Sequence, residues 1–118
     1  MAEPTNPVEI ESRIRDVVSY ISKGTKVVRQ ARDEYLAAKR KYHLALAGAR
    51  QSEQGTRTDR EDKALVANAQ LWEDMDTAEV TMKYAQDKKS DLESELSGLQ
   101  TSARLIAQEY NTAGRGQF

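Results

Sequence analysis

The sequence predicts an all-α protein, an antiparallel, coiled-coil-like helical hairpin that assembles into a larger helical oligomer. Apolar residues recur at alternating steps of three and four through residues 10–49, and the same alternation runs through residues 64–110. One Gly-containing stretch separates the two repeats and is too short for anything but an antiparallel return. Charged residues make up 31% of the chain, which is typical of helical hairpins and bundles.

The first helix is expected over residues 7–51, after a disordered lead at residues 1–6. Asn6 can cap its N-terminus, and the proline that follows suits the first helical position. The repeat continues through Gly24, which either breaks the helix within residues 22–25 or lies inside one long helix. The unbroken spacing favours the long helix. The residues expected to face the second helix are Ile10, Ile14, Val17, Ile21, Val28, Ala31, Tyr35, Ala38, Tyr42, Ala45 and Ala49.

The turn between the helices is expected at residues 52–58, with Gly55 at its centre. Thr58 is placed to cap the second helix, which is expected over residues 59–111. Acidic residues fill the first turn of that helix, where carboxylates interact favourably with the exposed N–H groups and the positive end of the helix dipole.

The second helix carries a matching apolar seam, interrupted by Asn68 and Lys89. Polar residues at such positions often specify register or oligomeric state at some cost in stability. Residues 112–118 have no periodic pattern and are expected to form a flexible tail. The other seam residues are Ala64, Leu71, Met75, Ala78, Met82, Ala85, Leu92, Leu96, Leu99, Ala103, Ile106 and Tyr110.

A second set of apolar residues lies off these seams and predicts self-association, because two helices bury only one stripe each. The alternative is that these residues flank one wide seam within the hairpin. The set comprises Val18, Val27, Leu36, Leu46, Leu65, Val66, Trp72, Val80 and Tyr84. The residues expected in the oligomer interface are Leu65, Trp72, Val80 and Tyr84.

Charge is unevenly distributed in a nearly neutral chain. Residues 23–60 hold ten basic and four acidic residues, and residues 61–118 hold six basic and eleven acidic residues. Cations interleaved with Tyr35 and Tyr42 are typical of a surface for single-stranded nucleic acid, which needs charge for phosphates and rings for bases. The alternative is that both tyrosines belong to the core and the charges to a solvated face. The expected phosphate-binding residues are Arg32, Lys39, Arg40, Lys41 and Arg50.

The composition argues against an enzyme, and no catalytic, metal or cofactor site is expected. The chain has no Cys and a single His, His43, which is expected at the surface. Asp74, Asp76 and Glu79 resemble an acid–base or magnesium cluster, but they lie on an acidic helix without converging loops, which favours plain solvation. The sequence contains no apolar run long enough to cross a membrane and no signal peptide pattern, so a soluble, cytoplasmic protein is expected.

Several segments together resemble UvsY-type recombination mediators and related small helical proteins of tailed phages. The similarity spans residues 35–107 and rests on Tyr35 with the basic run that follows it, ALAGAR at 45–50, Thr58-Asp59-Arg60, Trp72, Tyr84 and LSGLQTSAR at 96–104. The resemblance implies a ring-forming, non-enzymatic protein in the host cytoplasm that binds single-stranded DNA. Its implied partners are a RecA-like recombinase, which it helps to load, and the single-strand-binding protein that the recombinase replaces. In that family a Leu-Lys-Ala-Arg stretch before the turn is associated with DNA binding, and it corresponds here to Ala47-Gly48-Ala49-Arg50, which keeps the Arg but not the Lys.

Two other classes remain open. One is a helical-hairpin adaptor or virion assembly protein that acts only through protein–protein contacts, using the apolar edge and the acidic helix. The other is a helical-hairpin cargo of specialised bacterial secretion systems, which has the right length but carries a Trp-x-Gly at the turn that this sequence lacks. A salt-dependent single-strand binding assay separates the mediator from the adaptor.

Overall fold

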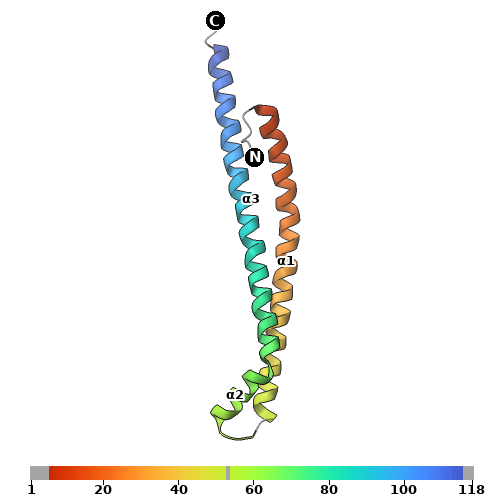
Figure 1. Cartoon of the computed structure of the whole chain (residues 1–118). Coiled ribbons are helices and arrows are strands. Elements are labelled where there is room, and N and C mark those ends of the chain that lie inside the picture. The colour runs from red at the N-terminus through yellow and green to blue at the C-terminus, as the bar shows by residue number, and fades with distance from the viewer. Residues whose placement is uncertain (1–5, 53, 116–118) are drawn as a thin grey trace. The chain divides into compact units, whose positions relative to one another are not determined.

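A computed structural model describes residues 6–52 and 54–115, and every regular element in it is an α-helix. The helices are α1 (Pro7–Ser52), α2 (Arg57–Ala67) and α3 (Ala69–Arg115) (Figure 1). The predicted all-α class is therefore confirmed. The contacts divide the chain into two units. Unit 1 comprises Met1–Lys26 and Asp87–Phe118, and unit 2 comprises Val27–Gln86.

Helix α1 begins where the sequence places a cap. The Asn6 side-chain oxygen accepts a hydrogen bond from the Glu9 backbone N–H at 2.9 Å, which satisfies one of the free donors of the first turn. The helix then runs through Gly24 without interruption, so the possible break at residues 22–25 is absent. It ends at Ser52, one residue beyond the expected end.

The turn between α1 and α2 depends on Gly55, whose φ of 117° lies in the region that favours glycine. The Thr56 side chain accepts a hydrogen bond from the Asp59 backbone N–H at 3.2 Å and caps α2. Thr56 therefore replaces Thr58, the expected cap, and the helix begins at Arg57, two residues earlier than expected. Thr58 itself lies inside the first turn of α2.

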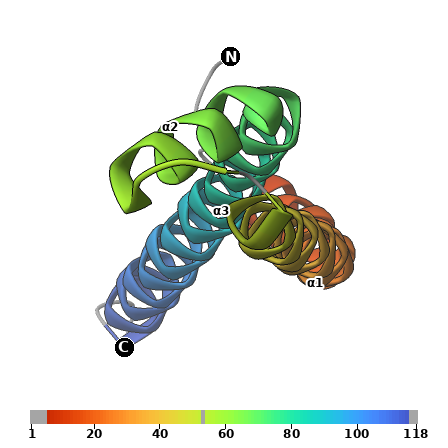
Figure 2. The ribbon, with the colours of Figure 1, turned by 90° about the horizontal axis from the view of Figure 1, so that it is seen from below.

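The expected continuous second helix is broken at Asn68, which separates α2 from α3. The Asn68 side-chain amide donates to the Ala64 carbonyl at 2.9 Å, and the Asn68 backbone N–H donates to the same carbonyl at 3.1 Å. A side chain that competes for a helical acceptor in this way distorts the helix locally. Figures 1 and 2 show α2 turned away from the direction of the first part of α3.

Helix α3 continues to Arg115, beyond the expected end at residue 111. Residues 112–115 are therefore helical, which corrects that part of the predicted flexible tail. The predictions of a disordered lead over residues 1–5 and of a flexible tail over residues 116–118 fall outside the described residues.

In unit 1, the segments of α1 and α3 pack antiparallel around a core of Ile10, Val17 and Leu99. Arg13 pairs with Glu95, whereas Gly24, further along α1, lies against Lys89, earlier in α3. Ile10 and Val17 are almost completely buried, and each such side chain contributes about 1.5–3 kcal/mol through removal of apolar surface from water.

Unit 2 contains a second core, in which Tyr42 and Leu46 of α1 surround Ala64 of α2. Ala49 also packs against this cluster, as do Leu71 and Met75 of α3. The predicted seam is largely confirmed across both units, because its members are buried or half-buried. The exception is Tyr110, which is exposed near the C-terminal end of α3. Leu46, expected off the seam, is buried because α2 packs over it.

Candidate nucleic-acid interface

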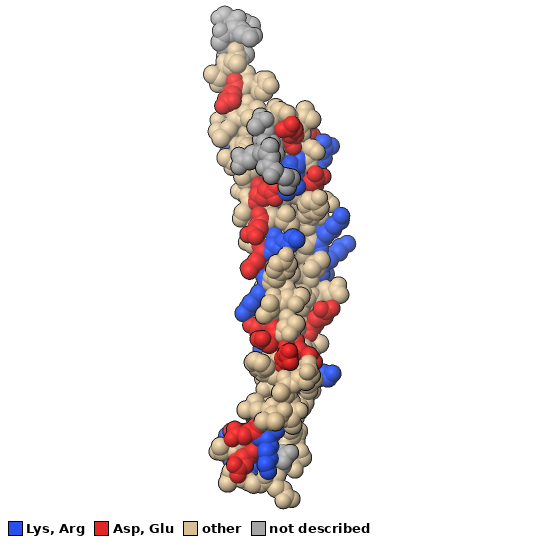
Figure 3. Space-filling view, in the orientation of Figure 1, with Lys and Arg blue, Asp and Glu red and all other residues tan. Residues whose placement is uncertain are grey.

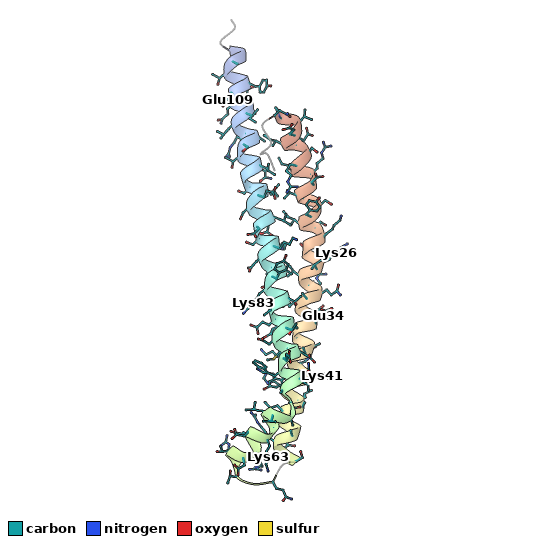
Figure 4. The ribbon with its side chains drawn as sticks, viewed as in Figure 1. Lys26, Glu34, Lys41, Lys63, Lys83 and Glu109 are labelled. Carbon is teal, nitrogen blue, oxygen red and sulfur yellow. The ribbon has the colours of Figure 1, made fainter. Side chains whose placement is uncertain are left out.

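The predicted phosphate-binding residues all lie on the part of α1 that belongs to unit 2, and all are exposed. Arg32 and Lys39 are seven residues apart and so share one flank of the helix. Lys39, Arg40 and Lys41 are consecutive and therefore fan out across its outer surface. Figure 4 shows Lys41 projecting from α1 on the side away from Lys83 of α3.

A shallow hollow of about 440 Å³ lies along this surface. Its lining combines two leucines with three groups that can interact with phosphate, namely Leu36, Leu44, Lys39, Arg40 and His43. Leu44 is 75% exposed, although it is one of the larger apolar side chains of the unit. The hollow therefore places the cationic side chains of Lys39 and Arg40 beside two apolar side chains. His43 is exposed, as predicted.

Lys39 also takes part in contacts inside the unit. Its Nζ atom lies 6.0 Å from the centre of the Tyr35 ring, a cation–π distance, and its charge acts on Glu79 of α3. Glu79 accepts a hydrogen bond from Lys83 Nζ at 2.7 Å. This bond, the charge of Lys83 and weaker interactions with Tyr35 and Lys39 lower the pKa of the Glu79 carboxyl.

The two tyrosines that the sequence associates with the basic run are not equally accessible. Tyr42 is only 6% exposed and belongs to the core of unit 2, whereas Tyr35 is half-buried. The alternative prediction, in which these residues face the core, therefore holds for Tyr42. The exposed aromatic side chains of unit 2 are Trp72 and Tyr84, both on α3.

Arg50 lies apart from the other four predicted residues, because it follows Lys41 by nine positions and about 13 Å of helix. The structure instead places Arg50 beside Arg57 and Arg60 of α2, around a hollow of about 300 Å³ that Gln51 and Glu61 also line. Figure 3 shows basic side chains beside acidic ones at the end of unit 2 that carries α2. Sequence reasoning missed Arg57 and Arg60, although their position just after the turn is a usable signal.

The four residues expected in an oligomer interface are exposed in unit 2. Leu65 is 45% exposed, Trp72 51%, Val80 62% and Tyr84 67%. Leu65 and Trp72 line a hollow of about 210 Å³ together with Ala69 and Tyr42. We call these four residues the apolar patch, and none of them contributes to the buried cores of the described residues.

The described residues hold no cluster of three or more His, Cys, Asp or Glu side chains that could bind a metal ion. Asp74 and Asp76 are exposed, and Glu79 is engaged by Lys83. Within the same part of the chain, no helix combines the length and the apolar character that crossing a bilayer requires.

Comparison of the chain with models of protein families, with curated proteins and with solved structures gave no match.

Proposed function

We propose that the protein is a non-enzymatic single-stranded DNA-binding protein that acts as a homo-oligomer. The observation that carries the proposal is that cations on α1 are exposed and are not neutralised by ion pairs within the described residues. Arg32, Arg40 and Lys41 are exposed and form no ion pair with another described residue, which leaves their charges available to an outside polyanion.

The segment of α3 in unit 2 differs from α1. Its single lysine, Lys83, forms an ion pair with Glu79, one helical turn away. Exposed pairs of this kind contribute little to stability, but they reduce the charge that α3 presents. The positive field of unit 2 therefore comes mainly from α1.

The surface chemistry suits a single strand better than a duplex. Phosphates provide a sequence-independent electrostatic attraction, and unstacked bases can also contact apolar or aromatic side chains. Leu36 and Leu44 lie beside Lys39 and Arg40 in the same hollow, so bases and phosphates could be contacted on one surface.

The apolar patch supports the proposed self-association, in which a second copy of this chain covers the patch. Exposed aromatic and aliphatic side chains of this size are typical of interfaces. The charges support a self-complementary contact, because the α1 segment of unit 2 is basic and its α3 segment carries Glu73, Asp74, Asp76 and Glu79 against Lys83 alone. Assembly would repeat the basic surface and multiply weak phosphate contacts.

The resemblance to UvsY-type mediators extends the proposal to phage recombination. In this role the protein would help a RecA-like recombinase replace a single-strand-binding protein on DNA. The test is a displacement assay, in which recombinase filaments form faster on coated single strands when the protein is present.

The DNA-binding proposal is tested by fluorescence anisotropy with a labelled single-stranded oligonucleotide at low salt, with a duplex of the same sequence as control. We expect binding that weakens steeply as salt is added, and weaker binding to the duplex. Unchanged anisotropy at low salt would exclude DNA binding.

An adaptor that binds only protein is the second candidate, and the exposed apolar patch is the observation that favours it. A chain that self-associates through this patch but leaves single-stranded DNA unbound at low salt would be assigned to this class.

A further inference from the structure

Three arginines meet at the end of unit 2 where α1 stops and α2 begins. Arg50 lies in the last turn of α1, Arg57 is the first residue of α2, and Arg60 follows one turn later. They line the hollow of about 300 Å³ together with Gln51 and Glu61. We call this group the arginine pocket.

The arginine pocket has an excess of positive charge. Glu61 is its single carboxylate, and it contacts Arg57 at 3.3 Å between Oε1 and Nε. Arg57 is 88% exposed, so this pair is well solvated and contributes little. Arg50 and Arg60 form no ion pair with another described residue. Three guanidinium groups around one hollow repel one another unless an anion joins them.

Arg60 provides a second, independent observation. Its Nε donor is shielded from solvent and has no hydrogen-bond partner among the described residues. Buried donors are almost always satisfied, so an unpaired one calls for an explanation, such as a bound water or ion. The guanidinium group is a fork of donors that matches the oxygens of a phosphate.

Arg57 occupies the first position of the 11-residue helix α2, so the turn holds its guanidinium near the end of α1 that carries Arg50. The N-terminus of α2 is already capped by Thr56 and carries Asp59 in its first turn, so the site rests on the side chains and not on the helix dipole. From this geometry we infer that Arg50, Arg57 and Arg60 form a binding site for a phosphate monoester dianion. Three guanidinium groups and one carboxylate give the pocket an excess of two positive charges. A phosphate monoester dianion, with a charge near −2, balances this excess better than an internal phosphodiester, which carries a single negative charge.

Two sources share this chemistry: a free phosphate or small phosphate ester, and the phosphorylated end of a nucleic-acid strand. The site does not depend on the proposed function, because neither the outer-surface cations of α1 nor DNA is needed to form it. Its test can therefore fail while the DNA-binding proposal stands, and the reverse also holds.

The first arm of the test uses inorganic phosphate. Isothermal titration and thermal unfolding are recorded in phosphate and in chloride of equal ionic strength, for wild type and for Arg57→Gln/Arg60→Gln. We expect saturable binding and a raised Tm for wild type in phosphate, because a ligand that binds only the folded state stabilises it. Loss of each arginine weakens binding by about tenfold or more. Lys63→Gln removes an exposed charge from the same helix and should leave binding unchanged.

The second arm compares labelled single strands that carry a 5′-phosphate, a 3′-phosphate or only hydroxyl ends. A strand end is the natural source if wild type prefers a phosphorylated end and the double variant loses that preference. A free phosphate is the source if inorganic phosphate binds and the strand ends are not distinguished.

Folding of the variants is checked by circular dichroism. The proposal is overturned if wild type responds equally to phosphate and chloride, or if a folded double variant binds phosphate as tightly as wild type does.

Discussion

Gly24 of α1 lies opposite Lys89 of α3, and a Cβ atom added at Gly24 would sit 3.9 Å from both Cβ and Cγ of that lysine. This is ordinary van der Waals contact, so the position has room for a methyl group. Gly24 is also an interior helical residue, without the positive φ that favours glycine. The glycine is therefore not required by the contact between the helices in unit 1.

Replacing Gly24 with alanine should stabilise the protein by about 1 kcal/mol, because glycine in a helix interior loses more backbone entropy on folding. Urea unfolding followed at 222 nm measures the change. Gly48→Ala is the matched control, since nothing lies within 4 Å of its added Cβ, and it should give a similar gain. A destabilised Gly24→Ala variant beside a stabilised Gly48→Ala variant would show that the helices approach more closely than the structure indicates.

The Glu79–Lys83 pair predicts a pH-dependent contribution to stability. Hydrogen bonding by Lys83, followed by its charge, lowers the pKa of Glu79, so the ionised carboxylate stabilises the folded state at neutral pH. This contribution is present above the ordinary glutamate pKa of 4.5 and disappears as the pH falls through the lower, folded-state value. At the alkaline end, Glu79 raises the pKa of Lys83 above 10.5, so the contribution is lost again as the pH rises through that raised value.

Glu79→Gln should therefore be less stable than wild type at pH 7, and the difference should shrink as the pH falls through the lowered pKa of Glu79. Chemical unfolding at a series of pH values measures the difference. Glu73→Gln is the control, because Glu73 is exposed on the same helix and forms no ion pair with another described residue. A difference that persists unchanged at pH 3 would show that the glutamine acts through packing and not through charge.

The apolar patch predicts that wild type is an oligomer and that Trp72→Glu lowers its mass. A charge placed in a desolvated interface is costly, whereas the same charge on the half-exposed Trp72 position of a single chain can remain hydrated. Sedimentation at micromolar concentration measures the mass, and circular dichroism checks that the helices remain.

The matched control is Val18→Glu, because Val18 is 50% exposed and lies in unit 1. It should leave the mass unchanged. A wild-type monomer at micromolar concentration would exclude self-association through the patch.

Replacing Lys39, Arg40 and Lys41 together with alanine should flatten the salt dependence of single-strand binding. Each neutralised phosphate contributes about −0.7 to the slope of log affinity against log salt, so the slope of the variant should be shallower by about 2 units. Because Lys39 is partly engaged by Tyr35 and Glu79, Arg40→Ala/Lys41→Ala should account for most of the change.

The control for this variant removes three exposed cations of the unit 1 part of α1, namely Arg15, Lys23 and Lys26. An equal loss of slope in both triple variants would indicate binding through net charge and not through the basic surface of unit 2.

The sequence by itself determined which side of each long helix is apolar. Steps of three and four keep a residue on one face whatever the helix packs against, so nearly every predicted seam position, from Ile10 to Ile106, is buried or half-buried. Helix caps are equally local, and the Asn6 cap of α1 was predictable for that reason.

Only the tertiary structure decided which side chains come together at the end of unit 2 that holds the α1–α2 turn. The bond from the Asn68 side chain to the Ala64 carbonyl is local, but the direction that α2 takes relative to α1 and α3 of unit 2 is not. Leu46 is consequently covered by α2, and Arg50 lies beside Arg57 and Arg60, away from the other predicted phosphate-binding residues. Periodicity describes one helix at a time, whereas the distance between side chains on two helices depends on the direction in which the chain leaves the turn.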